Sequence, residues 1–288
     1  MDIPQEVSSI LICPDDFSDL NFNQDFCICP KCNRIFVMKE NFIELKPHGN
    51  KQKIDENNYK EYYENLLKIG KDEKIGTFGL ISRSVSSGFV KETLSHIKEH
   101  IKKDMIVCDI GAGSGDYSID LAKNCKYILH CDLDLEGIKI AQNKAKTEHL
   151  KNIIFLCCDY LKLPLKSDKL DLVYSIDILE RGKKHEENLL REIFRIVKNQ
   201  GLAIVDFHSK ERKKVTQVEN SEIVAYSKEE IVLLIKKFNF KLEKILGTGF
   251  IPQVKKWSNS QYGFLNPIAK TLSFPPARWI AFLTKNNQ

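Results

Sequence analysis

Apolar runs alternate with helical patterns through the central part of the chain, and each apolar run ends at an acid, a serine or another polar residue. Runs of this length, bounded by turn residues, predict buried strands, and their alternation with helices predicts an α/β fold. The five strands predicted in this region are residues 105–110, a run that ends at 131–132, and residues 153–158, 168–175 and 202–207.

The C-terminal part of the chain predicts further elements. A capping pattern at Ser227 begins a helix, and residues 241–247 and 277–284 form a sixth and a seventh strand. Residues 250–276 connect these strands and are rich in aromatic residues and proline. Because long aromatic loops in compact domains usually carry function, we interpret this insertion as a lid over an apolar or planar acceptor, with a dimer contact as the alternative.

The N-terminal part divides into a small module and a linking region. Residues 46–56 are polar and contain proline and glycine, which predicts a linker, whereas residues 59–67 and 86–101 show helical spacing. The predicted domains are a module at 1–46, a linker with helices at 47–104, and an α/β domain at 105–288.

The first strand leads into a glycine-rich turn at 109–115 that contains Gly111, Gly113 and Gly115. Alternate glycines permit a tight turn and a close approach of the backbone to a ligand, and the helix predicted at 116–123 presents free N–H groups. The second strand ends at Asp132, about 20 residues on, where a ribose-binding acid belongs. The arrangement predicts a nucleoside-binding site.

The acids around this turn distinguish between two kinds of nucleoside ligand. A dinucleotide fold would have a third motif glycine where Asp116 stands, and a carboxylate there would repel a phosphate. S-adenosylmethionine carries a sulfonium, an ammonium and one carboxylate, but no phosphate. It therefore suits a pocket with several carboxylates, which we expect to be Asp109, Asp116, Asp132 and Asp159.

With these motifs in this order, residues 105–210 resemble a class I S-adenosylmethionine-dependent methyltransferase. In that family the aspartate after the second strand holds the ribose hydroxyls, and the one after the third strand contacts the adenine amino group. The resemblance implies a mostly parallel, Rossmann-like sheet of seven strands in the order 3-2-1-4-5-7-6, with N-terminal helices that cover the cofactor. The cofactor-binding residues that it implies are Asp109, Gly111, Gly113, Gly115, Asp132, Leu133, Asp159, Tyr160 and Ser175.

The nine cysteines fall into two groups. Five lie in or beside predicted strands, where reduced thiols pack as small apolar groups, and the other four crowd into the first 32 residues. Cys29 and Cys32 have the spacing of a zinc knuckle. A closed structural Zn²⁺ site would use Cys13, Asp16, Cys29 and Cys32, with Cys27 as an alternative fourth ligand.

Residues 10–45 resemble two families of zinc ribbon. One family activates transfer-RNA and protein methyltransferases, and the other begins the bacterial guanine-N1 methyltransferases of large-subunit ribosomal RNA. Both families normally have cysteine where this chain has Asp16. Two interpretations therefore stay open: a β zinc ribbon, and a ribbon fold that has lost its metal.

The distribution of charge bears on RNA as a partner. Residues 1–50 hold four Lys or Arg and eight Asp or Glu, a net charge of −4, so the overall +5 leaves +9 for the rest. An acidic ribbon is a poor binder of phosphates, and the basic run at 210–214 lacks interleaved aromatic residues. Residues 174–181 look more like the methyltransferases of quinones and other small metabolites than like the ribosomal RNA family.

The predicted function is S-adenosylmethionine-dependent methyl transfer by in-line displacement to a small-molecule or peptide-like acceptor, in which alignment and exclusion of water dominate. If the acceptor needs a base, His208 and Asp177 are the candidates, followed by His185 and Glu180. The alternative to a functional role for Asp159 and Asp177 is that they only end strands and cap helices. The alternatives are an RNA base methyltransferase and a noncatalytic, cofactor-binding adaptor.

Length and composition agree with an enzyme that has a large core. The chain has 288 residues, of which 42% are apolar and 29% are charged. No apolar run approaches 18 residues, so we expect no membrane span. Residues 1–9 lack the basic and apolar regions of a signal peptide, which predicts a cytoplasmic protein.

Overall fold

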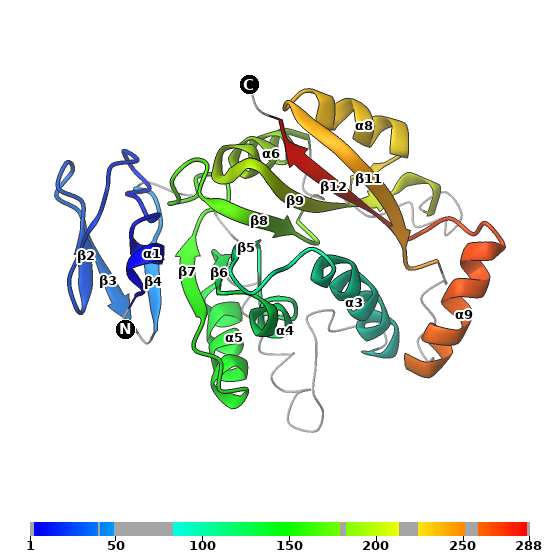
Figure 1. The fold of residues 1–288 in the computed structure, drawn as a ribbon, viewed down its shortest axis with the longest axis horizontal. Helices are drawn as coiled ribbons and strands as arrows, with labels where there is room; N and C mark the ends of the chain where they lie inside the picture. Colours follow the sequence, from blue (N-terminus) through cyan, green and yellow to red (C-terminus); the bar gives the residue numbers. More distant parts are fainter. Residues whose placement is uncertain are drawn as a thin grey trace.

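The computed structural model describes residues 3–39, 41–48, 83–178, 183–212, 224–250 and 259–286. Within these residues the strands form one large sheet, and helices cover both of its faces (Figure 1). Several predictions concern the remaining residues: the linker beyond residue 48, the helix at 59–67, Glu180, and residues 251–258 of the lid all lie outside the described residues, as does the side chain of His185.

The centre of the sheet has the predicted strand order. The strands β7, β6, β5, β8, β9, β12 and β11 lie side by side, which is the order 3-2-1-4-5-7-6 in predicted numbering. The first five of these are mutually parallel, and β12 runs antiparallel to both neighbours. Their bounds are β5 Ile106–Ile110, β6 Tyr127–Asp132, β7 Ile153–Cys158, β8 Leu170–Ser175, β9 Val197–Ser209, β11 Phe240–Thr248 and β12 Arg278–Lys285.

The sheet is larger than the seven strands predicted, because the N-terminal module joins it. Strand β4 (Phe42–Leu45) pairs in parallel with β7, so that Phe42 lies opposite Phe155. An open edge at β7 would leave a row of backbone N–H and C=O groups without partners, and β4 satisfies them. The described part of the sheet therefore contains twelve strands of mixed direction; the others are β1 Asn21–Phe22, β2 Phe26–Ile28, β3 Ile35–Lys39 and β10 Ala225–Tyr226.

The helices follow the apolar spacing of the sequence, with one difference at the glycine turn. The helix predicted at 116–123 is reduced to α4 (Ser118–Leu121) and a 3₁₀ turn at Ala122–Asn124, because the glycine turn continues through Gly115. The predicted cap at Ser227 is a complete capping box with Glu230. The remaining helices are α1 Gln5–Ser8, α3 Arg83–Lys98, α5 Leu135–Thr147, α6 Lys183–Ile196, α8 Lys228–Lys236 and α9 Asn259–Thr271.

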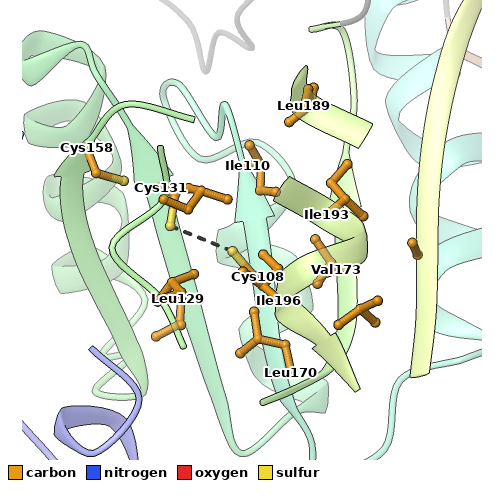
Figure 2. Packing of buried hydrophobic residues seen from close by; sticks show 14 of the residues in the cluster. Cys108, Ile110, Leu129, Cys131, Cys158, Leu170, Val173, Leu189, Ile193 and Ile196 are labelled. Carbon is orange, nitrogen blue, oxygen red and sulfur yellow. Dashed lines mark hydrogen bonds between the residues drawn. The ribbon is translucent and has the colours of Figure 1, made fainter. Parts of the chain in front are cut away.

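One apolar core runs without interruption from the N-terminal module into the α/β domain. It contains Ile43 and Leu45 of β4 together with Leu156 of β7, all fully buried. Figure 2 shows the part of this core around Cys108 and Cys131, whose Sγ atoms lie 3.7 Å apart. The prediction that the strand cysteines are core residues is confirmed, since the following five are buried: Cys108, Cys125, Cys131, Cys157 and Cys158.

None of the described helices combines the length with the low polarity that crossing a bilayer requires.

The shared core predicts that truncation within β4 destabilises the whole protein. Ile43 is fully buried, so Ile43→Ala should lower the free energy of unfolding by about 2–5 kcal/mol. The matched control is Ile35→Ala on β3, where the side chain is 56% exposed and the loss should stay below about 0.5 kcal/mol. Urea denaturation followed by circular dichroism measures both. Equal losses would contradict a continuous core.

Candidate functional site

Three predicted acids lie along one edge of the sheet. Asp109 is in β5, Asp132 ends β6, and Asp159 follows β7. These strands are parallel and in register, with Ile110 opposite Cys131 and Asp132 opposite Cys157. Because parallel strands end at the same edge, the acids meet where open α/β sheets bind their ligands.

The glycine turn packs directly on the end of β6. The backbone N–H groups of Gly111 and Ala112 both donate to the carbonyl oxygen of Cys131, at 2.8 and 3.1 Å. Gly111 has a φ of +72°, and a Cβ at this position would overlap the side chain of Ile178. Gly113 and Gly115 also have positive φ. The backbone path at this turn therefore requires glycine.

Asp132 lies against the glycine turn. Its Oδ2 accepts the N–H of Gly113 at 2.7 Å, and its Oδ1 accepts the N–H of Asp134 at 2.8 Å. Burial raises the pKa of Asp132 to about 6, although both N–H groups oppose this shift. The N–H of Leu133 also lowers the pKa of this carboxyl, and because a carboxylate has about four acceptor sites, Asp132 keeps acceptor capacity for a ligand hydroxyl.

Asp109 supports the site from inside the fold. Its carboxylate accepts the hydroxyl of Ser118 at the start of α4, and Ser118 Oγ also lies 3.0 Å from Nδ1 of His130. Burial raises the pKa of Asp109 to about 7, and the carboxylates of Asp132 and Asp116 add to this rise. The carboxylate of Asp109 thus links β5 to the first residue of α4 through a hydrogen bond.

The remaining predicted cofactor residues gather around the same strand ends. Asp159 is buried and accepts the N–H of Leu161 at 2.8 Å. Burial raises the pKa of the adjacent Tyr160 to about 12, with contributions from the carboxylates of Asp159 and Asp132. Ser175 Oγ donates to the carbonyl oxygen of Ile110 at 3.2 Å, and half-buried Leu133 directly follows Asp132.

Asp116 contributes less negative charge than its position in the sequence suggests. Its carboxylate forms an ion pair of 2.6 Å with Lys144 of α5, and its side chain is only 11% exposed. The expectation that Asp116 is one of the acids around the ligand stays a prediction, and the ion pair with Lys144 balances the charge of its carboxylate. The pairing neutralises one acid on the side of α5.

A second cluster lies at the ends of β8 and β9. The guanidinium of buried Arg278 donates to Asp206 at 2.8 Å and also to Asp177. The other oxygen of Asp206 accepts the N–H of Asp177 at 2.8 Å, and Nε2 of His208 lies 3.8 Å from the Asp177 carboxylate. The structure therefore brings the two predicted catalytic residues together, with Asp177 held by an ion pair.

Arg278 and Asp206 are residues of this cluster that sequence reasoning missed. The only signal in the sequence is a charged side chain within each of two apolar runs that were assigned to strands. Such a residue at a buried position usually has a partner of opposite charge. Nothing in the sequence identifies the partner, since Arg278 and Asp206 are 72 positions apart.

Tyr117 connects the second cluster with the glycine turn. Its hydroxyl is buried, and burial raises its pKa well above the usual range, with the carboxylates of Asp177 and Asp206 next in effect. From the other side, the ring of Phe89 on α3 lies 5.5 Å from the Arg278 guanidinium. The cluster is therefore enclosed between α3 and the segment that follows Gly115.

The described part of the predicted lid is helical. Helix α9 packs beside α3, and Asn266 Nδ2 donates to the Glu92 carboxylate at 3.2 Å. Asn266 Oδ1 accepts the N–H of Phe250 at 2.8 Å, and Glu92 also accepts the N–H of Gly249 at 3.1 Å. These contacts fix α9 at the end of β11, close to the start of β12.

The predicted zinc ligands converge in the N-terminal module. One ligand atom from each of Cys13, Asp16, Cys29 and Cys32 lies within 4.8 Å of all the others. Cys13 and Cys32 have their Sγ atoms 3.7 Å apart. Cys27 is fully buried in the apolar core and is not in this cluster, so the geometry favours Asp16 as the fourth ligand.

Comparisons with known proteins agree with this arrangement. Residues 108–205 match the family of the methyltransferase domain. The ribosomal protein L11 methyltransferase of Thermoanaerobacter sp. (strain X514) is 25% identical over 213 residues, which are 63% of this chain and 67% of that protein. Norajmaline N-methyltransferase of Rauvolfia serpentina is 34% identical over 99 residues, 33% of each chain.

Solved structures support the same fold. Magnesium protoporphyrin IX methyltransferase from Synechocystis PCC 6803, with bound S-adenosylhomocysteine, superposes with a TM-score of 0.57 at 15% identity and covers 81% of this chain and 100% of that one. A chain of the complex between the Haloferax volcanii Trm112 methyltransferase activator and a methyltransferase superposes with a TM-score of 0.55 at 16% identity. The match covers 69% of this chain and 90% of that one.

The domain match and the named relatives favour an enzyme over a noncatalytic adaptor and leave the acceptor open. With the α/β fold and the glycine turn, they show that the protein is an S-adenosylmethionine-dependent methyltransferase.

Proposed function

We propose that the protein transfers a methyl group from S-adenosylmethionine to a small-molecule or peptide-like acceptor by in-line displacement. The observation that carries this proposal is the free acceptor capacity of Asp132 beside the glycine turn. In this proposal Asp132 accepts both ribose hydroxyls, and Asp159 with Tyr160 faces the adenine. Gly111, Gly113 and Gly115 keep the turn open to the methionine end, with Leu133 and Ser175 as further contacts.

The donor set fits this cofactor. When bound, S-adenosylmethionine supplies an electrophilic methyl group on a sulfonium. Asp132 remains an acceptor at neutral pH, since its pKa is about 6. Asp109 holds α4 in place through Ser118, so that the first N–H groups after the turn keep their position. The role of these residues is to bind and orient the cofactor.

The second cluster supplies the acceptor side of the site. We assign His208 as the base for an acceptor that must lose a proton, with Asp177 as the carboxylate that orients its ring. Arg278 is a positioning residue, because it fixes Asp177 against Asp206 and lies opposite His208 in the pairing of β12 with β9. Packing of α3 against Arg278 limits the access of water to this cluster, in which the side chains of His208 and Asp177 are 23% exposed.

Several observations support a small or peptide-like acceptor. By their names, the proteins compared above methylate ribosomal protein L11, norajmaline and magnesium protoporphyrin IX. The cluster around Arg278 combines one cation with two carboxylates, a balance that offers little attraction to a polyanion. The N-terminal module is acidic overall. An RNA acceptor therefore stays the less favoured alternative.

We propose that residues 1–46 form a zinc-ribbon module with a structural role. Three thiolates and one carboxylate are a donor set that Zn²⁺ accepts, and two thiolates at about 2.3 Å from one tetrahedral zinc lie about 3.8 Å apart. The 3.7 Å between the Sγ atoms of Cys13 and Cys32 fits this geometry. The module also covers the edge of β7, which supports a role in stabilising the methyltransferase domain at 105–288.

A reducing compartment such as the cytoplasm fits the cysteines. All nine are free thiols, and the Sγ atoms of Cys108 and Cys131 form a hydrogen bond of 3.7 Å and no disulfide.

Removal of the Asp132 carboxylate should weaken cofactor binding. Asp132→Ala should reduce the affinity for S-adenosylmethionine by at least about 150-fold, because two hydrogen bonds to a charged acceptor, each worth about 1.5–3 kcal/mol, are lost. Binding to the natural protein should also weaken as the pH falls below about 6, where Asp132 becomes protonated. Asp120→Ala, at an exposed pair with Lys98, is the control for calorimetry. Unchanged affinity of Asp132→Ala would contradict the assignment.

Loss of the Arg278 charge should destabilise the protein strongly. Arg278→Met leaves the buried Asp206 and its neighbour Asp177 without their cation, so the free energy of unfolding should fall by about 3–5 kcal/mol. In the double variant Arg278→Met with Asp206→Asn, part of this loss should be regained. The control is Lys210→Met, at a surface pair with Glu230, with a change below about 1 kcal/mol. Similar losses for Arg278→Met and Lys210→Met in urea denaturation would refute the buried ion pair.

The zinc proposal predicts that substitutions of the two buried cysteines Cys29 and Cys27 have different effects on the zinc content of the protein. Purified protein should contain about one zinc per chain by elemental analysis, and Cys29→Ser should abolish it because a ligand is removed. Cys27→Ser should keep the metal, since Cys27 lies outside the cluster. Chelation should lower the melting temperature of the natural protein. Zinc lost equally from both variants, or absent from the natural protein, would count against the site.

A further inference from the structure

His130 is a fully buried imidazole beside the glycine turn. It lies on β6 opposite Asp109 of β5, and its ring centre is 5.0 Å from that of Phe155 on β7. Its Nδ1 lies 3.0 Å from Ser118 Oγ, whereas its Nε2 makes no hydrogen bond of normal geometry within the described residues. Because buried polar atoms are normally hydrogen-bonded, the second nitrogen indicates a role for this side chain.

The glycine turn rests on three consecutive residues of β6. The carbonyl oxygen of Cys131 accepts two N–H groups at the start of the turn, and Asp132 accepts the N–H of Gly113 at 2.7 Å. The backbone of Gly113 also raises the pKa of His130, an effect that a carbonyl oxygen close to the ring has. Since Nδ1 is occupied by Ser118, Nε2 is the nitrogen that faces this carbonyl. Both backbone polar groups of Gly113 therefore face side chains of β6.

The hydroxyl of Ser118 decides which nitrogen of His130 carries a proton. A hydroxyl donates one hydrogen bond, and Ser118 Oγ contacts both the Asp109 carboxyl and Nδ1 of His130. When Asp109 is ionised, the hydroxyl donates to its carboxylate, so Nδ1 must be the N–H that donates to Oγ. Nε2 is then without a proton and faces a carbonyl oxygen, with which it forms no hydrogen bond.

Protonation of Asp109 reverses this chain of hydrogen bonds. The carboxylic O–H donates to Ser118 Oγ, the serine hydroxyl donates to Nδ1, and the ring carries its proton on Nε2, where it donates to the carbonyl of Gly113. One proton enters in this change and is taken up at Nε2. The proton of Nδ1 passes to the serine oxygen, and the proton of the serine passes to Asp109. The ring is neutral in both arrangements, because burial lowers the pKa of His130 to about 3.

We propose that His130 is a positioning residue of the cofactor site, whose proton moves between Nδ1 and Nε2 with the protonation of Asp109 and, on Nε2, fixes the carbonyl of Gly113. This role rests on the proposed function, which assigns the glycine turn to the cofactor. Burial raises the pKa of Asp109 to about 7, so both arrangements occur near neutral pH. The hydrogen bond to Gly113 is present below this pH and is lost as the pH rises through it.

Several ionisable groups of the surrounding elements face this pair. Tyr174 of β8 lies opposite Asp109, and burial raises its pKa well above the usual range, so its hydroxyl stays neutral. The carboxylates of Asp132 and Asp116 raise the pKa of Asp109, and Lys144 of α5 lowers that of the imidazole. Asp132, whose pKa is about 6, becomes more fully ionised as the pH rises, which strengthens cofactor binding. Its effect on affinity therefore has the opposite sign to that of Asp109.

The position of the ring proton gives a direct test that needs no cofactor. In NMR of the labelled ring nitrogens, His130 should stay neutral between about pH 6 and about pH 8.5 and should change from the Nε2–H form to the Nδ1–H form near pH 7. Ser118→Ala removes the hydroxyl between the two side chains and should abolish this change. A ring that becomes charged in this range, or that keeps one tautomer throughout in the natural protein, would overturn the proposal.

Binding of S-adenosylhomocysteine, measured by calorimetry, tests the link to the turn. His130→Phe has no polar atoms and should weaken binding about three- to tenfold at about pH 6.5, which corresponds to one neutral hydrogen bond. His130→Gln offers an amide N–H toward Gly113 and should retain the affinity within about twofold. Between about pH 6.5 and about pH 8.5, the natural protein should lose about three- to tenfold more affinity than His130→Gln. The titrations of the ligand and of Asp132 are common to both proteins and cancel in this comparison.

The matched control is His100→Phe. The ring of His100 also packs beside a phenylalanine, at 5.2 Å from that of Phe282, but it precedes β5 and so lies at the opposite end of that strand from the glycine turn. This variant should bind S-adenosylhomocysteine as the natural protein does.

The outcomes separate the role of His130 from the proposed function. Equal binding by the natural protein and by both His130 variants, with Asp132→Ala still weakened, would overturn the role of His130 and leave the proposed function intact. Equal losses in His130→Phe and His130→Gln would also overturn it, because the ring would then only fill space. No binding by the natural protein would contradict the proposed function, and the tautomer change would still test His130.

Discussion

The parallel register of β7, β6, β5 and β8 is the constraint on which the candidate site depends. Cys108, Cys131 and Cys158 each precede one acid, and all three are buried in the core that Figure 2 shows. Because side chains alternate along a strand, burying these cysteines on one side directs the next residue away from that core. A slip of one residue would turn the carboxylates into that apolar core, away from the N–H and hydroxyl groups that they accept at the strand ends, at a large cost in free energy.

This constraint extends to the edge of the sheet. β7 lies between β6 and β4, so the strand that presents Asp159 is paired on both sides. The N-terminal module therefore contributes to the geometry of the site although its cluster of three cysteines and Asp16 lies apart from these strand ends. The cation of the second cluster comes from the other end of the chain, since Arg278 begins β12. Segments at both ends of the sequence thus complete a site built in the middle.

Much of this architecture could be predicted from local patterns. The strands, their order and the glycine turn follow from apolar runs and motif spacing, which are properties of consecutive residues. The pairing of β4 with β7 could not be predicted, because a short strand does not specify its neighbour. Charge pairs between residues far apart in the sequence could not be predicted for the same reason. Lys144 of the following helix neutralises Asp116, and Arg278 of β12 pairs with Asp206 of the neighbouring strand β9.

The central claim is that the acids at these strand ends recognise a nucleoside, with Asp132 on its sugar. A crystal structure of the protein with S-adenosylhomocysteine tests this most directly. The account predicts both ribose hydroxyls within hydrogen-bonding distance of the Asp132 carboxylate, and the homocysteine end beside Gly111 and Gly113. A nucleoside bound elsewhere, or a sugar turned away from Asp132, would contradict it.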